Sequence, residues 1–419
     1  MSLSGKGQQV KPGNLSHLLR VFLPFALGYF LSYLYRTVNA IIAPNLASDI
    51  GLDPASLGLL TSVYLLSFGL FQLPLGMLLD RFGPRRVEAA LLLVAAAGAF
   101  IFSQSNSLSG LMFGRALIGL GVSACLMAAF KAFAIWFPPE RLPLANGVQM
   151  ISGGLGALAA TTPVEAALTI TDWRGVFTVV AIMTVIAAVI IFLIVPEKEG
   201  SQSGETLSEQ LHGIRKVLSN PTFWRIAPWA FTAQGAYLSI YGLWSGPWLH
   251  DVAGYDRSSV ASILSTVAIA MILGYLLSGA IADRLIKRGV KPEIVAATGM
   301  LIFLGGQILM LFPHPSLTVV YWLWFGFFGA ACILPYAVLA QHFPTRLIGR
   351  VNTTLNLMVF MAAFSAQWGI GVIIDFWPEQ AGGGYAIAGY QAGFGVMVGL
   401  QVLAAIWFLA GKIFNKKIS

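Results

Sequence analysis

The stretch that decides the fold reads Gly76-Met-Leu-Leu-Asp80-Arg81-Phe-Gly83-Pro-Arg85-Arg86, a compact basic segment between two strongly apolar ones. Its core returns in the second half of the chain as Gly279-Ala-Ile-Ala-Asp283-Arg284, again with a basic pair behind it. One such stretch is no more than a basic turn between helices, but two copies at equivalent places indicate a duplicated membrane protein. Glycine lets two helices approach closely, aspartate can cap a helix end or pair with arginine, and the cations hold the loop in the cytoplasm.

Both loops are therefore predicted to act in conformational change, joining the ends of the two halves in one state and releasing them in the other. The residues assigned to this role are Gly76, Asp80, Arg81, Gly83, Arg85 and Arg86 in the first loop, and Gly279, Asp283 and Arg284 in the second.

Composition excludes an ordinary soluble fold, because 57% of the residues are hydrophobic and only 10% are charged, against about 25% charged in a typical soluble domain. Cys125 and Cys332 lie inside apolar segments, so they suggest neither a disulfide framework nor a metal site. The net charge of +8 comes from basic residues in short loops between apolar runs, which is a signal of membrane topology rather than of nucleic-acid binding.

Apolar stretches close to the ~20 residues that a helix needs to cross the bilayer recur along the whole chain. Twelve fit, which predicts an all-α membrane protein with two six-helix bundles: an N-terminal bundle at 1–196, a cytoplasmic linker at 197–221 and a C-terminal bundle at 222–419. The spans are expected at 19–45, 57–79, 87–104, 110–136, 144–168, 173–195, 222–249, 259–282, 292–312, 316–341, 351–376 and 390–410.

The lysines and arginines place both termini in the cytoplasm and the protein in the cell inner membrane as a multi-pass protein. With that orientation only Arg174 and Arg257 fall outside, while Arg36, Arg115 and Lys131 lie within spans. No cleavable signal peptide is expected, since the first apolar run is too long and follows a polar arm.

Arg115-x-x-x-Gly119-x-Gly121 opens the fourth span. With the span layout and the two Asp-Arg loops, it resembles the major facilitator superfamily over essentially the whole chain. The resemblance implies a monomer in the lipid bilayer, with two six-helix bundles around a central cavity that opens alternately to either side. It also implies secondary active transport.

Within that superfamily, the run Ser32-Tyr33-Leu-Tyr35-Arg36-x-x-Asn39 is similar to the anion:cation symporter group and, more weakly, to the organophosphate antiporters. This resemblance implies an organic anion as substrate. The chain departs from the group where Tyr35 replaces an acid that often precedes the arginine, and where Val122 replaces a carboxylate expected two turns after Arg115. Both departures count against proton symport.

Polar side chains inside the spans are the candidates for substrate binding, because an ionisable group in hydrocarbon is costly unless it faces a cavity or a partner. Arg36 lies past the middle of the first span, on the same helix side as Tyr33 and Asn39, and its guanidinium offers a fork of donors to a carboxylate or phosphate. The alternative is that Arg36 reaches the outer interface or pairs structurally. The further candidates are Arg115, for which binding and a structural helix contact stay equally open, and Gln149, Gln234, Tyr241 and Asn356.

Acidic residues at membrane depth are scarce. Glu165, near the outer end of the fifth span, is the one candidate for proton coupling, although it can equally be an exposed helix-end acid. Asp80, Glu88, Asp283 and Asp375 are expected in loops, and the coupling ion, proton or sodium, stays open.

The sequence thus predicts a secondary active transporter of a small organic anion such as a carboxylate or sugar acid, with Arg36 as the main anchor. No enzyme signature, catalytic residue, cofactor motif or metal cluster is apparent, and no nucleic-acid partner is expected. An exporter of amphipathic or cationic compounds, an exchanger of organophosphates or other anions, and a non-transporting receptor of the same fold are the alternatives.

Overall fold

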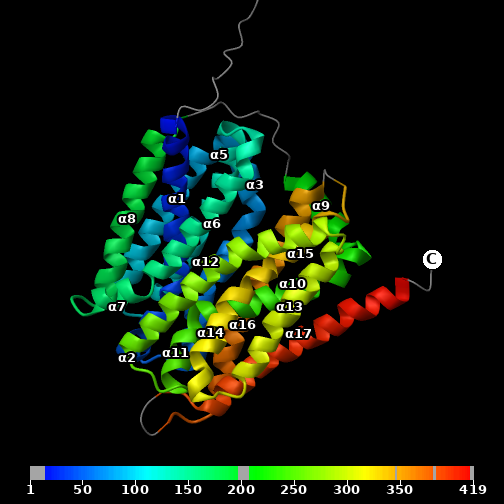
Figure 1. Cartoon of the computed structure of the whole chain (residues 1–419). Helices are drawn as coiled ribbons and strands as arrows, with labels where there is room; N and C mark the ends of the chain where they lie inside the picture. Colours follow the sequence, from blue (N-terminus) through cyan, green and yellow to red (C-terminus); the bar gives the residue numbers. More distant parts are fainter. Residues whose placement is uncertain (1–14, 197–206, 345–346, 381–383, 416–419) are drawn as a thin grey trace, which may run out of the picture.

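The computed structural model describes residues 15–196, 207–344, 347–380 and 384–415, and helices make up nearly all of them (Figure 1). In the first half, the helices are α1 (Leu15–Thr37), α2 (Asn39–Ile50), α3 (Pro54–Gln104), α4 (Leu108–Gly121), α5 (Cys125–Trp136), α6 (Leu142–Ala159), α7 (Thr162–Leu168) and α8 (Trp173–Ile194). The second half follows with α9 (Leu207–Leu218), α10 (Pro221–Ser239), a π-helical turn (Ile240–Trp244), α11 (Ser245–Asp251), α12 (Arg257–Lys287), α13 (Pro292–Met310), α14 (Thr318–Gly329), α15 (Leu334–Ala340), α16 (Ile348–Ile374) and α17 (Ile387–Asn415).

The basic stretch at 76–86 is a kink inside α3 rather than an open loop. α3 has 51 residues, and an unbroken helix of that length would measure about 76 Å, more than twice the hydrocarbon thickness of a bilayer. Gly83 divides it with a φ of 76°, which an L side chain rarely adopts, and Pro84 begins the next helical segment. The spans predicted at 57–79 and 87–104 therefore lie on the two arms of α3.

Several of the predicted spans are broken helices. Among the described residues, eight helical segments are long and apolar enough to cross a membrane, and nine if α1 and α2, which are bent by 46°, form one broken span. The spans predicted at 144–168 and 222–249 are not among them: a short break separates α6 from α7, and a π-helical turn joins α10 to α11. The count of twelve fits this arrangement and stays a prediction.

The helices of the first half, α1 to α8, pack together on one side of the molecule, and α10 to α17 pack on the other (Figure 1). We call the end that carries 80–86, 283–288 and α9 the basic end, and the end that carries α2, α7 and α11 the far end. The halves meet where α3 packs on α16, α6 and α7 pack on α12, and α2 packs on α11. At this last crossing the backbones touch, since a Cβ on Gly246 would overlap the carbonyl oxygen of Ala40.

Candidate substrate site

Arg36 occupies the last turn of α1, immediately before the break that begins α2. Its side chain is buried, with 9% of the residue exposed. The guanidinium carbon lies 4.8 Å from the ring centroid of Tyr33, 5.0 Å from that of Phe68 and 5.5 Å from that of Phe360. A desolvated cation over such rings gains about 2 kcal/mol, so these aromatic faces fix the position of the guanidinium.

The rings around Arg36 come from both halves of the protein. Phe68 of α3 stacks on Phe360 of α16, with centroids 4.3 Å apart and an interplanar angle of 27°. α3 and α16 can approach each other this closely because residue 69 is a glycine. A Cβ on Gly69 would lie only 2.6 Å from the Cβ of Phe360. Arg36 therefore lies where the halves contact each other, as a substrate anchor of a two-bundle carrier requires.

No acidic side chain neutralises Arg36. Within the described ranges no ion pair joins it to a carboxylate, and its Nε has no hydrogen-bond partner. Its polar neighbours are the hydroxyl of Tyr64, with which it forms a hydrogen bond, and the hydroxyls of Tyr33 and Tyr29. A positive charge is thus buried at this position without a counter-ion, a costly arrangement that a bound anion would relieve.

Tyrosines from three helices converge beside Arg36. On α1 the rings of Tyr29 and Tyr33 meet edge to face at 5.1 Å, and at the end of α10 Tyr237 and Tyr241 lie parallel with centroids 5.9 Å apart. The hydroxyls of Tyr237 and Tyr241 are buried without a partner, and both interact electrostatically with Tyr33, as does Tyr275 of α12. We call Tyr33, Arg36, Phe68, Tyr241, Tyr275 and Phe360 the anchor cluster.

The remaining polar candidates do not all join the anchor cluster. Asn39, in the first turn of α2, is buried with its Oδ1 unpartnered, and so are the Oε1 atoms of Gln149 and Gln234. The amide nitrogen of Gln149 is already paired, because Nε2 donates to the carbonyl of Phe25 at 3.1 Å. Asn356 accepts a hydrogen bond from the hydroxyl of Tyr336 at 3.2 Å.

The described contacts of Arg115 all lie inside the first half. It is fully buried, its Nη1 donates to the carbonyl of Tyr35 at 3.1 Å, and its guanidinium lies 4.8 Å from the ring of Phe102 and 5.2 Å from that of Phe177. Like Arg36 it has nitrogens without a partner, Nε and Nη2, but no aromatic ring of the second half is described beside it. The structure thus does not bring Arg115 to the substrate side of Arg36. Its contacts favour the structural helix contact over binding.

Glu165, the predicted proton-coupling acid, forms an ion pair across the far end. Its Oε1 lies 3.2 Å from Nε of Arg257, the first residue of α12, and Arg257 also donates to Oδ1 of Asn45 at 2.8 Å. Beside it, the hydroxyls of Thr161 and Ser265 lie 2.7 Å apart. These contacts join the two halves at the far end, and we call them the seal.

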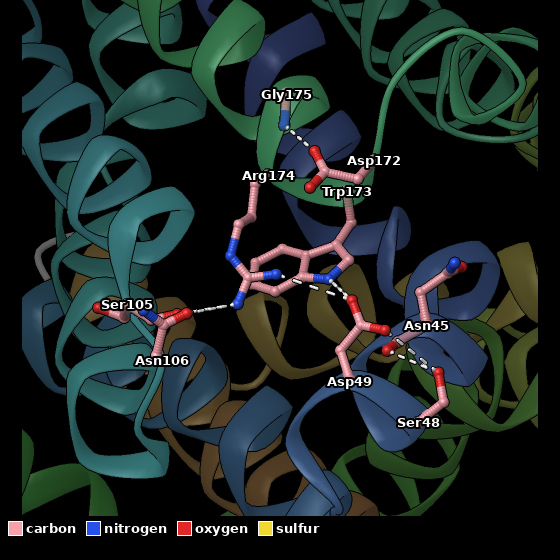
Figure 2. Close-up of polar contacts among 9 residues, drawn as sticks. All are labelled: Asn45, Ser48, Asp49, Ser105, Asn106, Asp172, Trp173, Arg174 and Gly175. Atoms are coloured by element: carbon pink, nitrogen blue, oxygen red, sulfur yellow. Dashed lines mark hydrogen bonds and ion pairs between the residues drawn. The ribbon is translucent and has the colours of Figure 1, made fainter.

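A polar network holds the far end of the first half together (Figure 2). The indole nitrogen of Trp173 donates to Oδ2 of Asp49 at 2.9 Å, and Arg174 donates to Oδ1 of Asn106 at 2.8 Å while its Nη1 lies 3.7 Å from the same Asp49 oxygen. α2, α3 and α8 are thereby fastened to one another. Through Asn45 of α2, the network continues to Arg257 of the second half.

The two aspartates of the basic stretches pair within their own halves. Asp80 forms an ion pair with Lys131 of α5, and Asp283 with Lys287 on the next turn of α12, where Nζ and Oδ2 are 2.6 Å apart. Arg81 lies over the ring of Phe82 at 5.2 Å. Among the contacts described at these aspartates, none crosses between the halves.

Sequence reasoning misplaced three acids and missed several aromatic residues. Asp80 and Asp283, expected in loops, lie on the helices α3 and α12, because these helices continue through the basic stretches. The expectation that Glu88 lies in a loop is wrong, because α3 resumes at Pro84 and carries Glu88 into the interior, where it is fully buried. Phe68, Tyr275 and Phe360 were not singled out. Nothing in the local sequence distinguishes an aromatic residue that faces a cation from one that packs in a core.

The family model described as Major Facilitator Superfamily matches residues 25–367. A probable sulfoacetate transporter of Cupriavidus necator is 24% identical over 300 residues, which are 68% of this chain and 70% of that protein. A hexuronate transporter of Escherichia coli K12 is 24% identical over 316 residues, 70% of this chain and 73% of that protein. Among solved structures, a bacterial homologue of the human lysosomal transporter Spinster, in an inward-facing and occupied conformation, has a TM-score of 0.73 with 20% identity, covering 96% of this chain and 99% of its own.

Proposed function

The chain belongs to the major facilitator superfamily, a family of multi-pass membrane transporters and not of enzymes, and on that premise we propose that it moves a small organic anion by alternating access. One observation carries the substrate class: the guanidinium of Arg36 is buried at the contact between the halves without an acidic partner. Its planar fork can give two parallel hydrogen bonds to a carboxylate or sulfonate. Relatives named for sulfoacetate and hexuronate support this class.

The proposal includes the orientation of the protein in the membrane and the division of the chain into two bundles. The basic end faces the cytoplasm with both termini, the protein lies in the cell inner membrane as a monomer, and a proton or sodium ion drives transport. One bundle comprises residues 1–196 and the other 222–419, joined by the linker 197–221 that contains α9. In this orientation, the seal around Arg257 and Glu165 closes the outer side.

The rest of the anchor cluster shapes the substrate. Tyr33, Tyr241 and Tyr275 offer ring faces and hydroxyls, which suit a sugar acid or an anion with an apolar part. The same aromatic walls favour a second candidate, an exporter of amphipathic compounds. A purely cationic substrate is disfavoured because it would be brought beside Arg36.

A thermal-shift panel on the purified protein tests the proposal. Sulfoacetate, glucuronate, galactonate, phosphate esters and cationic drugs are added to the wild type, to Arg36→Ala, and to Lys287→Ala as a control that removes an exposed cation. We expect an organic anion to stabilise the wild type and the Lys287→Ala control but not Arg36→Ala. Stabilisation by cationic or neutral amphipathic compounds alone would assign the protein to the second candidate.

A further inference from the structure

Glu88 lies one turn into the second arm of α3 and is completely buried among helices of the first half. α1 faces it with Gly28, where an added Cβ would collide with a carboxylate oxygen, and Ile191 of α8 packs beside that glycine. In the described part of the chain neither oxygen of Glu88 accepts a hydrogen bond of good geometry, and the donor beside it is the thiol of Cys125, which donates only weakly. A carboxylate without a strong donor is strongly disfavoured in such surroundings, whereas the neutral acid is tolerated.

The contacts described for Glu88 include no cation. On α1 its carboxylate lies against Gly28, beside which Ile191 of α8 packs, and on α5 it interacts with the thiol of Cys125. On α3 itself, Arg85 lies one turn earlier and places its guanidinium 4.9 Å from the ring centroid of Phe192. No ion pair to Glu88 occurs among the described residues.

Cys125 connects Glu88 to the anchor cluster. Its thiol interacts electrostatically with Arg36 as well as with Glu88, and Tyr64, which interacts with Arg36, is also its neighbour. The geometry of α1 gives the separation: a carboxylate oxygen of Glu88 lies against Gly28, and Arg36 follows on the same helix eight residues later, about 12 Å along its axis. The first half thus buries a cation without an anion and an acid without a cation beside one helix. If Glu88 is ionised, its charge offsets that of Arg36; if it is neutral, Arg36 favours an external anion.

We propose that Glu88 is a proton-binding site whose neutral carboxyl group and an anion on Arg36 occupy the protein together. A solvent proton adds to one carboxylate oxygen of Glu88, so a proton and a monovalent anion enter with no net change of charge. The two ligands favour each other's binding by the same factor. This inference rests on the proposed function for its anion, whereas the proton site itself can be tested without any substrate.

The test begins with infrared spectroscopy of the purified full-length protein, which reports the carbonyl stretch of a protonated carboxyl group. We expect a band that is present near neutral pH, disappears at alkaline pH, and is absent from Glu88→Gln, which keeps the size of the side chain. Glu140→Gln, which changes an exposed acid, is expected to keep the band. A wild-type spectrum identical to that of Glu88→Gln would overturn the proposal, and so would a band that persists at every pH at which the protein is folded.

The coupling between Glu88 and Arg36 is measured from the pH midpoint at which the same infrared band disappears. Removing the cation in Arg36→Gln makes ionised Glu88 less favourable, so the band is expected to disappear about one pH unit higher. An unchanged midpoint would show that the two groups are independent and would overturn the coupling.

Binding of glucuronate, galactonate and sulfoacetate then separates the two hypotheses. Above the wild-type midpoint, affinity is expected to fall by about tenfold per pH unit at most, and to level off above the midpoint of the anion-bound protein. The affinity of Glu88→Gln should not change with pH over the same range. Wild-type affinity that does not depend on pH would overturn the linkage. If none of the three anions binds the wild type, the proposed substrate class fails, while the infrared midpoints still decide whether Glu88 holds a proton beside Arg36.

Discussion

Arg257 and Glu165 join the two halves of the protein at the far end, with 3.2 Å between Nε and Oε1. The pair is partly exposed, with 42% of the arginine side chain and 18% of the glutamate side chain accessible. Such pairs contribute only about 0.2–1 kcal/mol, so this one adjusts an equilibrium between conformations and does not hold the fold.

Glu165→Gln should therefore shift the population away from the conformation closed at the far end by up to about fivefold. Spin labels at Ile170 and Phe312, both strongly exposed near the far end, would report longer distances by pulsed electron resonance. The exchanged pair Glu165→Arg with Arg257→Glu should restore the distribution. Identical distances in the wild type and Glu165→Gln would remove the seal from the mechanism.

Arg36→Lys should weaken anion binding and Arg36→Ala should abolish it, because an ammonium keeps the charge but loses the planar fork. Charged hydrogen bonds contribute roughly 1.5–3 kcal/mol each, so the loss of two predicts at least about a hundredfold lower affinity. Titration calorimetry with the anion that gives the largest thermal shift measures this. Arg115→Ala should cost less affinity, since its contacts lie inside the first half. Near-normal binding by a folded Arg36→Ala protein would contradict the anion site at Arg36. Gln234, Tyr241 and Asn356 would then be the candidates for substrate binding.

Asp80→Asn and Lys131→Met should move the conformational equilibrium in opposite directions. In the closed far-end conformation Asp80 pairs with Lys131, and in the opposite conformation we expect it to bind the second half near Asp283 and Arg284. Lys131→Met removes only the first of these contacts and should favour the opposite conformation. Asp80→Asn weakens both, and we expect the loss of the contact between the halves to be the larger, which favours the conformation closed at the far end. Labels at the exposed positions Glu140 and Lys291 would follow the basic end. A shift in the same direction for both variants would contradict the role given to the loop.

Gly246→Ala should prevent full closure of the far end, because the added Cβ would overlap the carbonyl oxygen of Ala40 on the other half. Neither side can yield, since both atoms belong to helical backbones that cross in contact. Uptake is expected to fall strongly while the protein still folds. Gly305→Ala is the matched control, since a Cβ there meets nothing within 4 Å, and it should transport like the wild type. Equal transport by both variants would show that the backbones at this crossing separate at little cost.

The helical membrane architecture could be predicted from the sequence because it depends on properties that repeat along the chain. Hydropathy over ~20 residues marks the spans, and the duplicated Asp-Arg stretches mark the two halves. The depth of Arg36 in the membrane could also be predicted, because it depends only on the position of Arg36 within one apolar stretch of the sequence. The breaks after Thr37 and Ala159 could not, because they depend on how each helix crosses its neighbours.

The site was only partly predictable because its parts lie far apart in the chain. Phe68 and Phe360 meet through the packing of α3 on α16, and no local pattern records that contact. Glu88 was misplaced for a different reason: hydropathy averages over a window, so an acid next to a basic stretch appears to lie outside the membrane. One positive-φ glycine, Gly83, turns the chain early enough to bury it.

The bend after Thr37 divides the first span into a part that carries the anchor, Arg36, and a part that closes the far end, α2. Beside α2 lies a hollow lined by Ala40, Ile41, Pro44, Glu165, Gly246, His250, Arg257 and Val260, away from the anchor cluster. The hollow has a volume of only about 20 Å³, so a small molecule would enter it only if the seal widened, and it would then hold the far end open without occupying the place beside Arg36. Inhibition at this hollow would therefore act on the equilibrium between conformations rather than on the anchor cluster itself.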